Sequence, residues 1–239
     1  MGGRMGVKED LSVRIAGEIV LSREPCKTIK KWREVFGVSQ AALAESLGVS
    51  PSVICDYESG RRRSPGSRVV RRLVDAFIRI DEEHGSKILK AYERMGVGGS
   101  LSGAVLDIME FPYPIKASKV MDAIQGKAVA NGDLLNRDIY GYTVLDSVKA
   151  ILELPSEDFI RIYGLTSERA LVFTGVSLGR SPFVAIRVST IKPGMVVLHG
   201  IKEADPLGLK IAKRDKIPVI LSGLDTQEEL IQRLREVTG

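Results

Sequence analysis

The sequence is poor in the residues that build metal centres, disulfide frameworks and many catalytic sites. Its 239 residues include two cysteines, Cys26 and Cys55, and two histidines. The cysteines form no Cys-x-x-Cys motif and no histidine pair lies near them, so neither a disulfide framework nor a Cys/His zinc site is expected. Aromatic residues make up 5% of the chain, and no stacking platform for single-stranded nucleic acid is evident. We therefore expect no metal and no cofactor.

Other signatures are also missing from the chain. No apolar run approaches the ~20 residues that span a bilayer, and the N-terminal residues 1–5 lack the apolar core of a secretion signal. The sequence contains no P-loop, no Gly-x-Gly-x-x-Gly after a strand, no His-Glu-x-x-His and no Gly-x-Ser-x-Gly. These absences predict a cytoplasmic protein that has no membrane partner and is not an enzyme.

Positive charge is concentrated in one part of the sequence. The whole chain carries a net charge of +5, yet residues 27–72 hold ten basic and four acidic residues, so the remainder carries −1. A clustered basic patch is the electrostatic footprint of contacts with nucleic-acid phosphates. The alternative is a solvated charged face on an ordinary helical domain. The run Arg61-Arg62-Arg63 favours phosphate binding.

Residues 38–60 have the pattern of two short helices joined by a tight turn. Ser39 suits the N-cap of the first helix, and Gly48 suits its C-terminal end. Ser50 is expected to cap the second helix, Pro51 fits its first position, and Gly60 ends it. Apolar residues recur at helical spacing in both segments. The pattern predicts a helix-turn-helix, which places its second helix in the DNA major groove.

The segment resembles the helix-turn-helix of the Cro-repressor-like (XRE) regulators over residues 29–77, about a fifth of the chain. Five positions match the family in order and spacing: Gln40, Ala44, Gly48, Glu58 and Gly60. An arginine one turn before the motif, which the family pairs with the recognition-helix Glu, corresponds to Arg33. A longer stretch, from residue 31 to residue 66, resembles an archaeal branch whose members carry an additional C-terminal domain. The resemblance implies a lambda-repressor-like helical domain that binds double-stranded DNA.

The candidate DNA-binding residues lie in and beside the two motif helices. Gln40 is expected to reach a phosphate, and Pro51 and Ser52 to face base edges. Asp56, one turn after Ser52, suits the cytosine amino group and would repel wrong sites; relatives carry Gln or Arg at these places. Arg33 and Glu58 are assigned to a partly buried structural pair. The full set of DNA-binding candidates is Ser39, Gln40, Ser50, Pro51, Ser52, Asp56, Arg61, Arg62 and Arg63.

The chain is long enough for about two domains. We expect an α+β protein overall, in which an all-α domain (1–95, with the motif at 39–60) precedes a linker (96–100) and a C-terminal α/β domain (101–239). Further helices are predicted in the first domain at 9–22, 27–37, 68–84 and 86–95, with Pro25 ending the first of them.

The C-terminal region mixes strand and helix patterns. Strand-length apolar runs predict strands at 105–111, 170–176, 183–188, 195–198 and 217–221. Amphipathic stretches predict helices at 116–124, 144–154, 155–163, 205–213 and 226–237. Prolines 112 and 114 are expected to stop the first strand. The expected N-caps are Thr143 or Ser147, Ser156 and Thr226.

Four residues in this region are candidates for ligand binding. Arg180 and Ser181 lie in a polar, glycine-containing loop between two predicted strands, where an anion could be held. His199 ends a predicted strand, and Asp205 opens the helix after it, near the strand ends where α/β sheets tend to bind ligands. The alternative is a hairpin loop and a structural histidine.

These patterns predict a transcriptional regulator whose C-terminal domain dimerises, senses a small-molecule effector, or does both. We expect a homodimer on an inverted repeat, because one recognition helix reads only a few base pairs. Two other hypotheses remain open. One is an enzyme-regulator whose C-terminal domain turns over a small molecule, and the other is an RNA-binding or antitoxin-like module.

Overall fold

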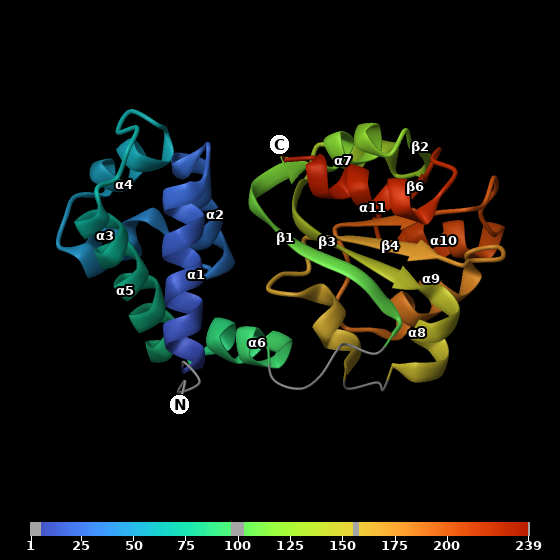
Figure 1. Cartoon of the computed structure of the whole chain (residues 1–239), viewed down its shortest axis with the longest axis horizontal. Helices are drawn as coiled ribbons and strands as arrows, with labels where there is room; N and C mark the ends of the chain where they lie inside the picture. The colour runs from blue at the N-terminus through green and yellow to red at the C-terminus, as the bar shows by residue number, and fades with distance from the viewer. Residues whose placement is uncertain (1–5, 97–102, 155–157, 239) are drawn as a thin grey trace. The chain divides into compact units, whose positions relative to one another are not determined.

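The computed structural model describes residues 6–96, 103–154 and 158–238. The chain divides into two compact units: a helical domain of residues 1–97 with 112–114, and a C-terminal domain of residues 98–111 with 115–239. Most of the predicted linker, residues 97–100, lies outside the described residues. The predicted α+β class is confirmed, with helices alone in the first domain and a mixed sheet with helices in the second (Figure 1).

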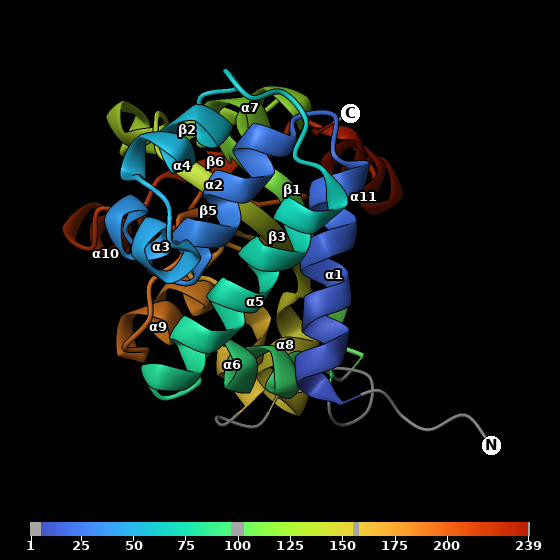
Figure 2. The same ribbon diagram turned by 90° about the vertical axis from the view of Figure 1, so that its left-hand side faces the viewer.

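The helical domain consists of helices, whose arrangement Figure 2 shows, packed around an apolar centre. Leu11 and Ile15, Trp32, Leu43 and Phe77 are fully buried and come from four different helices. Pro25 does not end the first helix as predicted. It is the first residue of the second, where its missing N–H costs nothing. The helices are α1 (Val7–Leu21), α2 (Pro25–Val35), α3 (Gln40–Leu47), α4 (Pro51–Glu58), α5 (Ser67–Glu83) and α6 (Lys87–Gly96).

The C-terminal domain contains a six-stranded sheet in the order β1-β3-β4-β5-β6-β2. Strands β3 to β6 are parallel, and β1 and β2 pair antiparallel at the two edges. The strands are β1 (Val105–Lys116), β2 (Lys127–Ala130), β3 (Asp138–Asp146), β4 (Ala170–Thr174), β5 (Met195–Leu198) and β6 (Val219–Leu221). The helices are α7 (Ala117–Ala123), η1 (Gly132–Leu134), α8 (Ser147–Glu153), η2 (Asp158–Tyr163), α9 (Arg180–Val188), α10 (Pro206–Arg214) and α11 (Gln227–Glu236).

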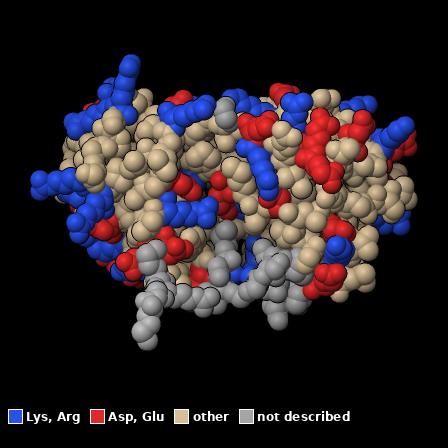
Figure 3. Space-filling model, in the orientation of Figure 1, with Lys and Arg blue, Asp and Glu red and all other residues tan. Residues whose placement is uncertain are grey.

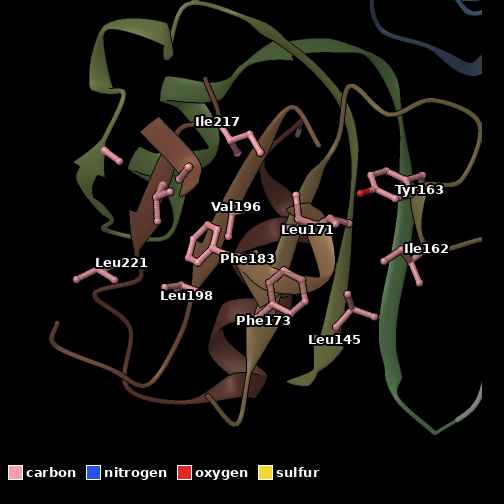
Figure 4. Close-up of a cluster of buried hydrophobic side chains, with 14 residues drawn as sticks. Leu145, Ile162, Tyr163, Leu171, Phe173, Phe183, Val196, Leu198, Ile217 and Leu221 are labelled. Carbon is pink, nitrogen blue, oxygen red and sulfur yellow. The ribbon is translucent and has the colours of Figure 1, made fainter. Parts of the chain in front are cut away.

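Helices cover both faces of this sheet. The connections β3-α8-β4, β4-α9-β5 and β5-α10-β6 join neighbouring parallel strands in one direction, and right-handed crossovers place their helices on one face. Alternate strand residues meet these helices: Leu171 and Phe173, with Val196 and Leu198, belong to one buried cluster with Phe183 of α9 (Figure 4). Helices α7 and α11 pack against each other on the other face. Strands buried on both faces explain the continuous apolar runs.

Two predictions for this domain are wrong because short apolar runs fit strand and helix equally well. Residues 183–188, predicted as a strand, form the C-terminal two-thirds of α9, which begins at Arg180. The predicted helix 144–154 begins inside β3, and only residues from Ser147 onward are helical. The N-cap of α8 is Asp146 rather than Thr143 or Ser147, and its carboxylate accepts from the amides of Val148 and Lys149.

The prediction that prolines 112 and 114 stop the first strand is also wrong. Strand β1 continues to Lys116, with a register shift between Glu110 and Ile115. Proline lacks an N–H, and an edge strand with an irregular register is where the sheet tolerates it. The predicted cap Ser156 lies outside the described residues, whereas Thr226 caps α11 by accepting from the amide of Glu229.

A buried ion pair fastens the β1 edge of the sheet. The Arg169 guanidinium lies 2.8 Å from the Glu110 carboxylate, and both side chains are almost fully buried. Arg169 also donates to the carbonyls of Tyr163, Met109 and Tyr142. A buried charge is tolerated only with such partners. This pair therefore joins β1 and β3 to the start of β4 and the end of η2.

Candidate nucleic-acid interface

The motif helices α3 and α4 are joined by a turn whose geometry matches its sequence. The Ser39 hydroxyl accepts from the Ala42 amide at 3.1 Å and so caps α3 as predicted. Gly48 ends α3 at φ 64°, a left-handed conformation that favours glycine. Leu43 and Ile54 are buried and anchor the two helices in the core. The turn thereby holds α4 at a defined angle to α3.

Ser50 occupies the N-cap position of α4 but makes no capping hydrogen bond to the backbone. Its hydroxyl instead shares a 2.7 Å hydrogen bond with the hydroxyl of Ser52. Ser50 therefore lies at the predicted N-cap position of α4, but it does not make the expected hydrogen bond to the backbone. Because Ser50, Pro51 and Ser52 are all exposed, the first turn of α4 presents its hydroxyls and orphan amides to the outside.

The Glu58 carboxylate at the end of α4 joins three helices. Arg33 of α2 donates to it twice, from Nε to Oε1 at 2.5 Å and from Nη2 to Oε2 at 3.0 Å. Gln40 of α3 donates from Nε2 to Oε2 at 2.8 Å. Arg33 also donates from Nη1 to the Val38 carbonyl at 3.0 Å. The side chain of Glu58 is 4% exposed and that of Arg33 12%, so the two charges are well shielded from water.

This network gives Gln40 a second task beside the predicted phosphate contact. Its amide nitrogen donates to Glu58, and the residue is partly exposed at the start of α3. The phosphate contact itself stays a prediction. The structure supplies the support that such a contact needs, because the bond to Glu58 holds the Gln40 side chain in place.

Asp56 lies on the outer side of α4 and is already engaged by arginines. The Arg61 Nε lies 2.6 Å from Asp56 Oδ1, and the Arg62 Nε lies 3.8 Å from Oδ2. The Arg62 guanidinium also lies over the Tyr57 ring, 5.5 Å from its centroid. An arginine that binds a carboxylate still has further donors for a phosphate. The two arginines also offset the negative charge of Asp56.

The structure divides the basic patch into buried and exposed members. Lys31 is buried with its Nζ 2.6 Å from Glu18, and Arg33 belongs to the Glu58 network. Arg72 donates to the Leu47 carbonyl at the end of α3. The members other than Lys31 and Arg33 are exposed: Lys27, Lys30, Arg61, Arg62, Arg63, Arg68, Arg71 and Arg72. Figure 3 shows basic side chains over the outer edge of the helical domain.

The support of α3 by α5 was missed by sequence reasoning. Arg79 donates to both the carbonyl and the hydroxyl of Ser46, close to where Arg72 binds the Leu47 carbonyl. Cations at a helix C-terminus satisfy its free carbonyls and oppose the negative end of its dipole. A signal was present, since Arg72 and Arg79 are seven residues apart and lie on one side of α5.

The candidate ligand residues lie at the carboxyl ends of β4 and β5. Arg180, the first residue of α9, donates to Asp205 at 2.7 Å, and Asp205 caps α10 by accepting from the amides of Leu207 and Gly208. The hydrogen bond from Arg180 lowers the pKa of Asp205 to about 2. Ser181 is exposed on the first turn of α9. The loop before α9 therefore joins a strand to a helix, so the prediction of a loop between two strands and the hairpin alternative are both wrong.

His199 follows β5 in the same region and differs from its neighbours in having an unsatisfied atom. Its side chain is buried, and among the residues that the structure describes its Nδ1 has no hydrogen-bond partner. Burial lowers the pKa of the imidazole, which keeps it neutral. The structure brings Arg180 and Asp205 into contact, and within its described residues neither is bonded to the Nδ1 of His199. The ligand role of these residues stays a prediction.

Within the described residues, no group of three His, Cys, Asp or Glu side chains is arranged to hold a metal ion. Cys26 and Cys55 are both free thiols. No helix in the described part of the chain has the length and apolarity of a membrane span.

Comparison with known proteins agrees with this geometry. A helix-turn-helix family model matches residues 29–82, which cover α3, α4 and most of α5. An uncharacterised HTH-type transcriptional regulator of Methanocaldococcus jannaschii is 48% identical over 231 residues, 96% of this chain and 95% of the relative. A second such regulator, from Archaeoglobus fulgidus, is 46% identical over 224 residues, 93% of this chain and 95% of the relative. No solved structure matches.

Removal of Glu58 should destabilise the helical domain strongly. Glu58→Ala removes both acceptors of the bidentate bond from a guanidinium that is shielded from water, and breaking a buried pair on one side costs about 3 kcal/mol. Urea unfolding followed by the fluorescence of Trp32, the only tryptophan, measures the loss. The control Glu45→Ala, on the exposed side of α3, should change the free energy of unfolding by less than about 0.5 kcal/mol. Equal effects of the two substitutions would contradict the role assigned to the network.

Arg180→Met should raise the pKa of Asp205 from about 2 toward its ordinary value of 3.8. The rise should be incomplete, because the amides of Leu207 and Gly208 still stabilise the carboxylate. A carboxylate whose pKa is lowered by folding stabilises the folded protein above pH 3.8, and this contribution is lost as the pH falls to about 2. In the variant the contribution should be smaller and should be lost at a higher pH. Carboxyl NMR titration measures the shift. Arg187→Met, at the other end of α9, is the control and should leave the Asp205 pKa unchanged.

Proposed function

The chain belongs to the HTH-type transcriptional regulators, and from this premise we propose that it is a sequence-specific regulator that binds an inverted repeat in double-stranded DNA as a homodimer. The relatives that establish the family match the C-terminal domain as well as the helix-turn-helix. We further propose that the C-terminal domain binds a small-molecule effector.

The exposed first turn of α4 is the observation that carries the DNA-binding part of the proposal. Pro51 and Ser52 stand at the outer end of a helix whose other end is fastened by Glu58. Recognition helices of this class insert their N-terminal residues into the major groove. Asp56 follows one turn later with Arg61 attached. We assign base recognition to Ser52 and Asp56, and phosphate contacts to Gln40 and the three consecutive arginines.

The homodimer follows from the small number of bases that one such helix can read. An eight-residue helix reaches only a few base pairs. Two copies related by a two-fold axis double the recognised sequence when their half-sites lie about one helical turn apart. This arrangement predicts an inverted repeat in the operator.

The effector site is proposed at the carboxyl end of β5. Ligands of open α/β sheets bind outside the carboxyl ends of the strands. Support comes from the buried Nδ1 of His199, which lacks a partner among the described residues, and from the Arg180–Asp205 pair, whose members open the helices that follow β4 and β5. A ligand with an acceptor for Arg180 or a donor for His199 would suit these groups.

The test of this function is selection of genomic DNA fragments by the purified full-length protein at ~150 mM salt with excess competitor DNA. We expect enrichment of one inverted repeat. Salt-sensitive binding without enrichment would contradict sequence-specific regulation and would direct attention to RNA. Preferential retention of RNA would contradict the proposal directly.

Replacement of Arg61, Arg62 and Arg63 by Ala should weaken binding to all DNA sequences alike. Because each phosphate contact releases a counterion, the slope of log affinity against log salt should flatten by up to about three. The matched control removes three exposed basic residues of the C-terminal domain, Lys210, Lys213 and Arg214, and should leave the slope close to that of the parent. An unchanged slope in the arginine variant would mean that these residues do not contact phosphate.

A further inference from the structure

An apolar face of the C-terminal domain is left uncovered by the chain itself. Eleven large hydrophobic side chains are exposed among the described residues, and six of them belong to the neighbouring segments α8, η2 and α9. Leu152 and Val188 are the most exposed of the six, at 78% and 80%. We call this surface the α8–α9 face and define it by Val148, Ile151, Leu152, Ile160, Val184 and Val188.

The members of this face lie on one side of the sheet. Helices α8 and α9 follow β3 and β4 in successive parallel crossovers, which place both on the same face of the sheet. Leu154 after α8 and Phe159 of η2 pack against the buried cluster that contains Phe183 of α9. Figure 1 shows α8 and α9 close together in the lower part of the C-terminal domain.

A groove runs along the same face. It has a volume of about 430 Å³ and is lined mainly by apolar atoms from η2 and from the end of α9. Its walls include Phe159 and Ile160 on one side and Ala185, Val188 and Ile191 on the other. In a closely packed interface, projecting side chains of one partner fill a groove of the other, and this face has both features.

Most side chains of helix α8 are not buried by the described part of the chain. It has seven residues, and only Ser147 and Ala150 are buried. Val148, Ile151 and Leu152 point away from the domain's own core. Apolar side chains grouped in this way mark interaction surfaces, because scattered surface hydrophobics need no partner but a contiguous patch does.

We propose that the α8–α9 face is the surface through which a second copy of this chain docks. The inference rests on the homodimer of the proposed function and adds to it the surface that forms the dimer. A two-fold interface brings the same patch of both copies together and must therefore be complementary to itself. The apolar side chains of the face meet this condition, because they carry no charge to repel the same side chains of a second copy.

The charges on α8 fit the same occupant. Lys149 and Glu153 are exposed and stand one turn apart on the helix. If two α8 helices run antiparallel across the axis, Lys149 of each copy faces Glu153 of the other. A different protein would need its own matching pair, whereas a second copy supplies it by symmetry. Two-fold homodimers are also the commonest oligomers, and their interfaces are richer in apolar surface than the average protein exterior.

The test is sedimentation of the full-length protein and two variants of the face, Leu152→Glu and Val188→Glu. We expect a dimer for the parent protein and, for each variant, dimerisation weakened by about 100-fold. Both residues are largely exposed, so unchanged circular dichroism and melting temperature are expected and separate loss of association from loss of folding. Two positions on different helices make the result independent of either substitution.

The matched control is Leu21→Glu in α1, which is 84% exposed and lies in the helical domain. It should leave the dimer intact. A strictly monomeric parent protein, dimeric Leu152→Glu and Val188→Glu variants, or dissociation by Leu21→Glu would each overturn the proposal. The last result would assign the dimer to α1, whose Val13 and Val20 are also exposed.

The DNA result separates this inference from the proposed function. If the parent protein selects an inverted repeat and both face variants still bind it as dimers, the surface is wrong and the regulator stands. If the face variants are monomers and the parent selects no DNA sequence, the surface stands and the sequence-specific regulator fails. When both hold, the monomeric variants should keep the salt-sensitive binding and lose the preference for the repeat.

Discussion

The Glu58 carboxylate is the constraint on which the DNA-binding geometry depends. A shielded carboxylate needs several donors, and this one receives them from α2 and α3 while it is carried by α4. No single pair of these helices could satisfy it. The three helices are therefore held in one arrangement, which sets the direction of α4 and the reach of Ser52 and Asp56. Arg169 has a corresponding role in the C-terminal domain, where its buried guanidinium donates hydrogen bonds to acceptors from separate segments.

Charge in the helical domain has two uses that the sequence does not distinguish. Lys31 and Arg33 are shielded and hold helices together, and Arg72 and Arg79 bind carbonyls at the end of α3. The arginines after α4 are exposed, as are Lys27 and Lys30 before it. The basic patch thus contains shielded members that position helices as well as exposed ones.

Helix α9 connects the two features that the proposals assign to the C-terminal domain. Its first residue, Arg180, binds Asp205 at the carboxyl edge of the sheet. Its last residue, Val188, is exposed on the α8–α9 face and lines the groove there. Between them, Phe183 and Ile186 are buried in the core cluster. One nine-residue helix therefore meets the proposed effector edge, the core and the proposed dimer face.

The sequence by itself determined the helix-turn-helix, because caps, glycines and apolar spacing act within a few residues of each other. It also determined the α+β class, whereas the pair of Arg33 and Glu58 was expected from the family resemblance and is present in the structure. Residues 183–188 could not be assigned from the sequence, since a short apolar run is buried equally well as strand or helix. Only the tertiary structure decided that Gln40 joins the Glu58 network, that Arg180 pairs with Asp205, and that β1 continues past two prolines. These outcomes depend on which distant segments become neighbours, and local residue patterns carry no such information.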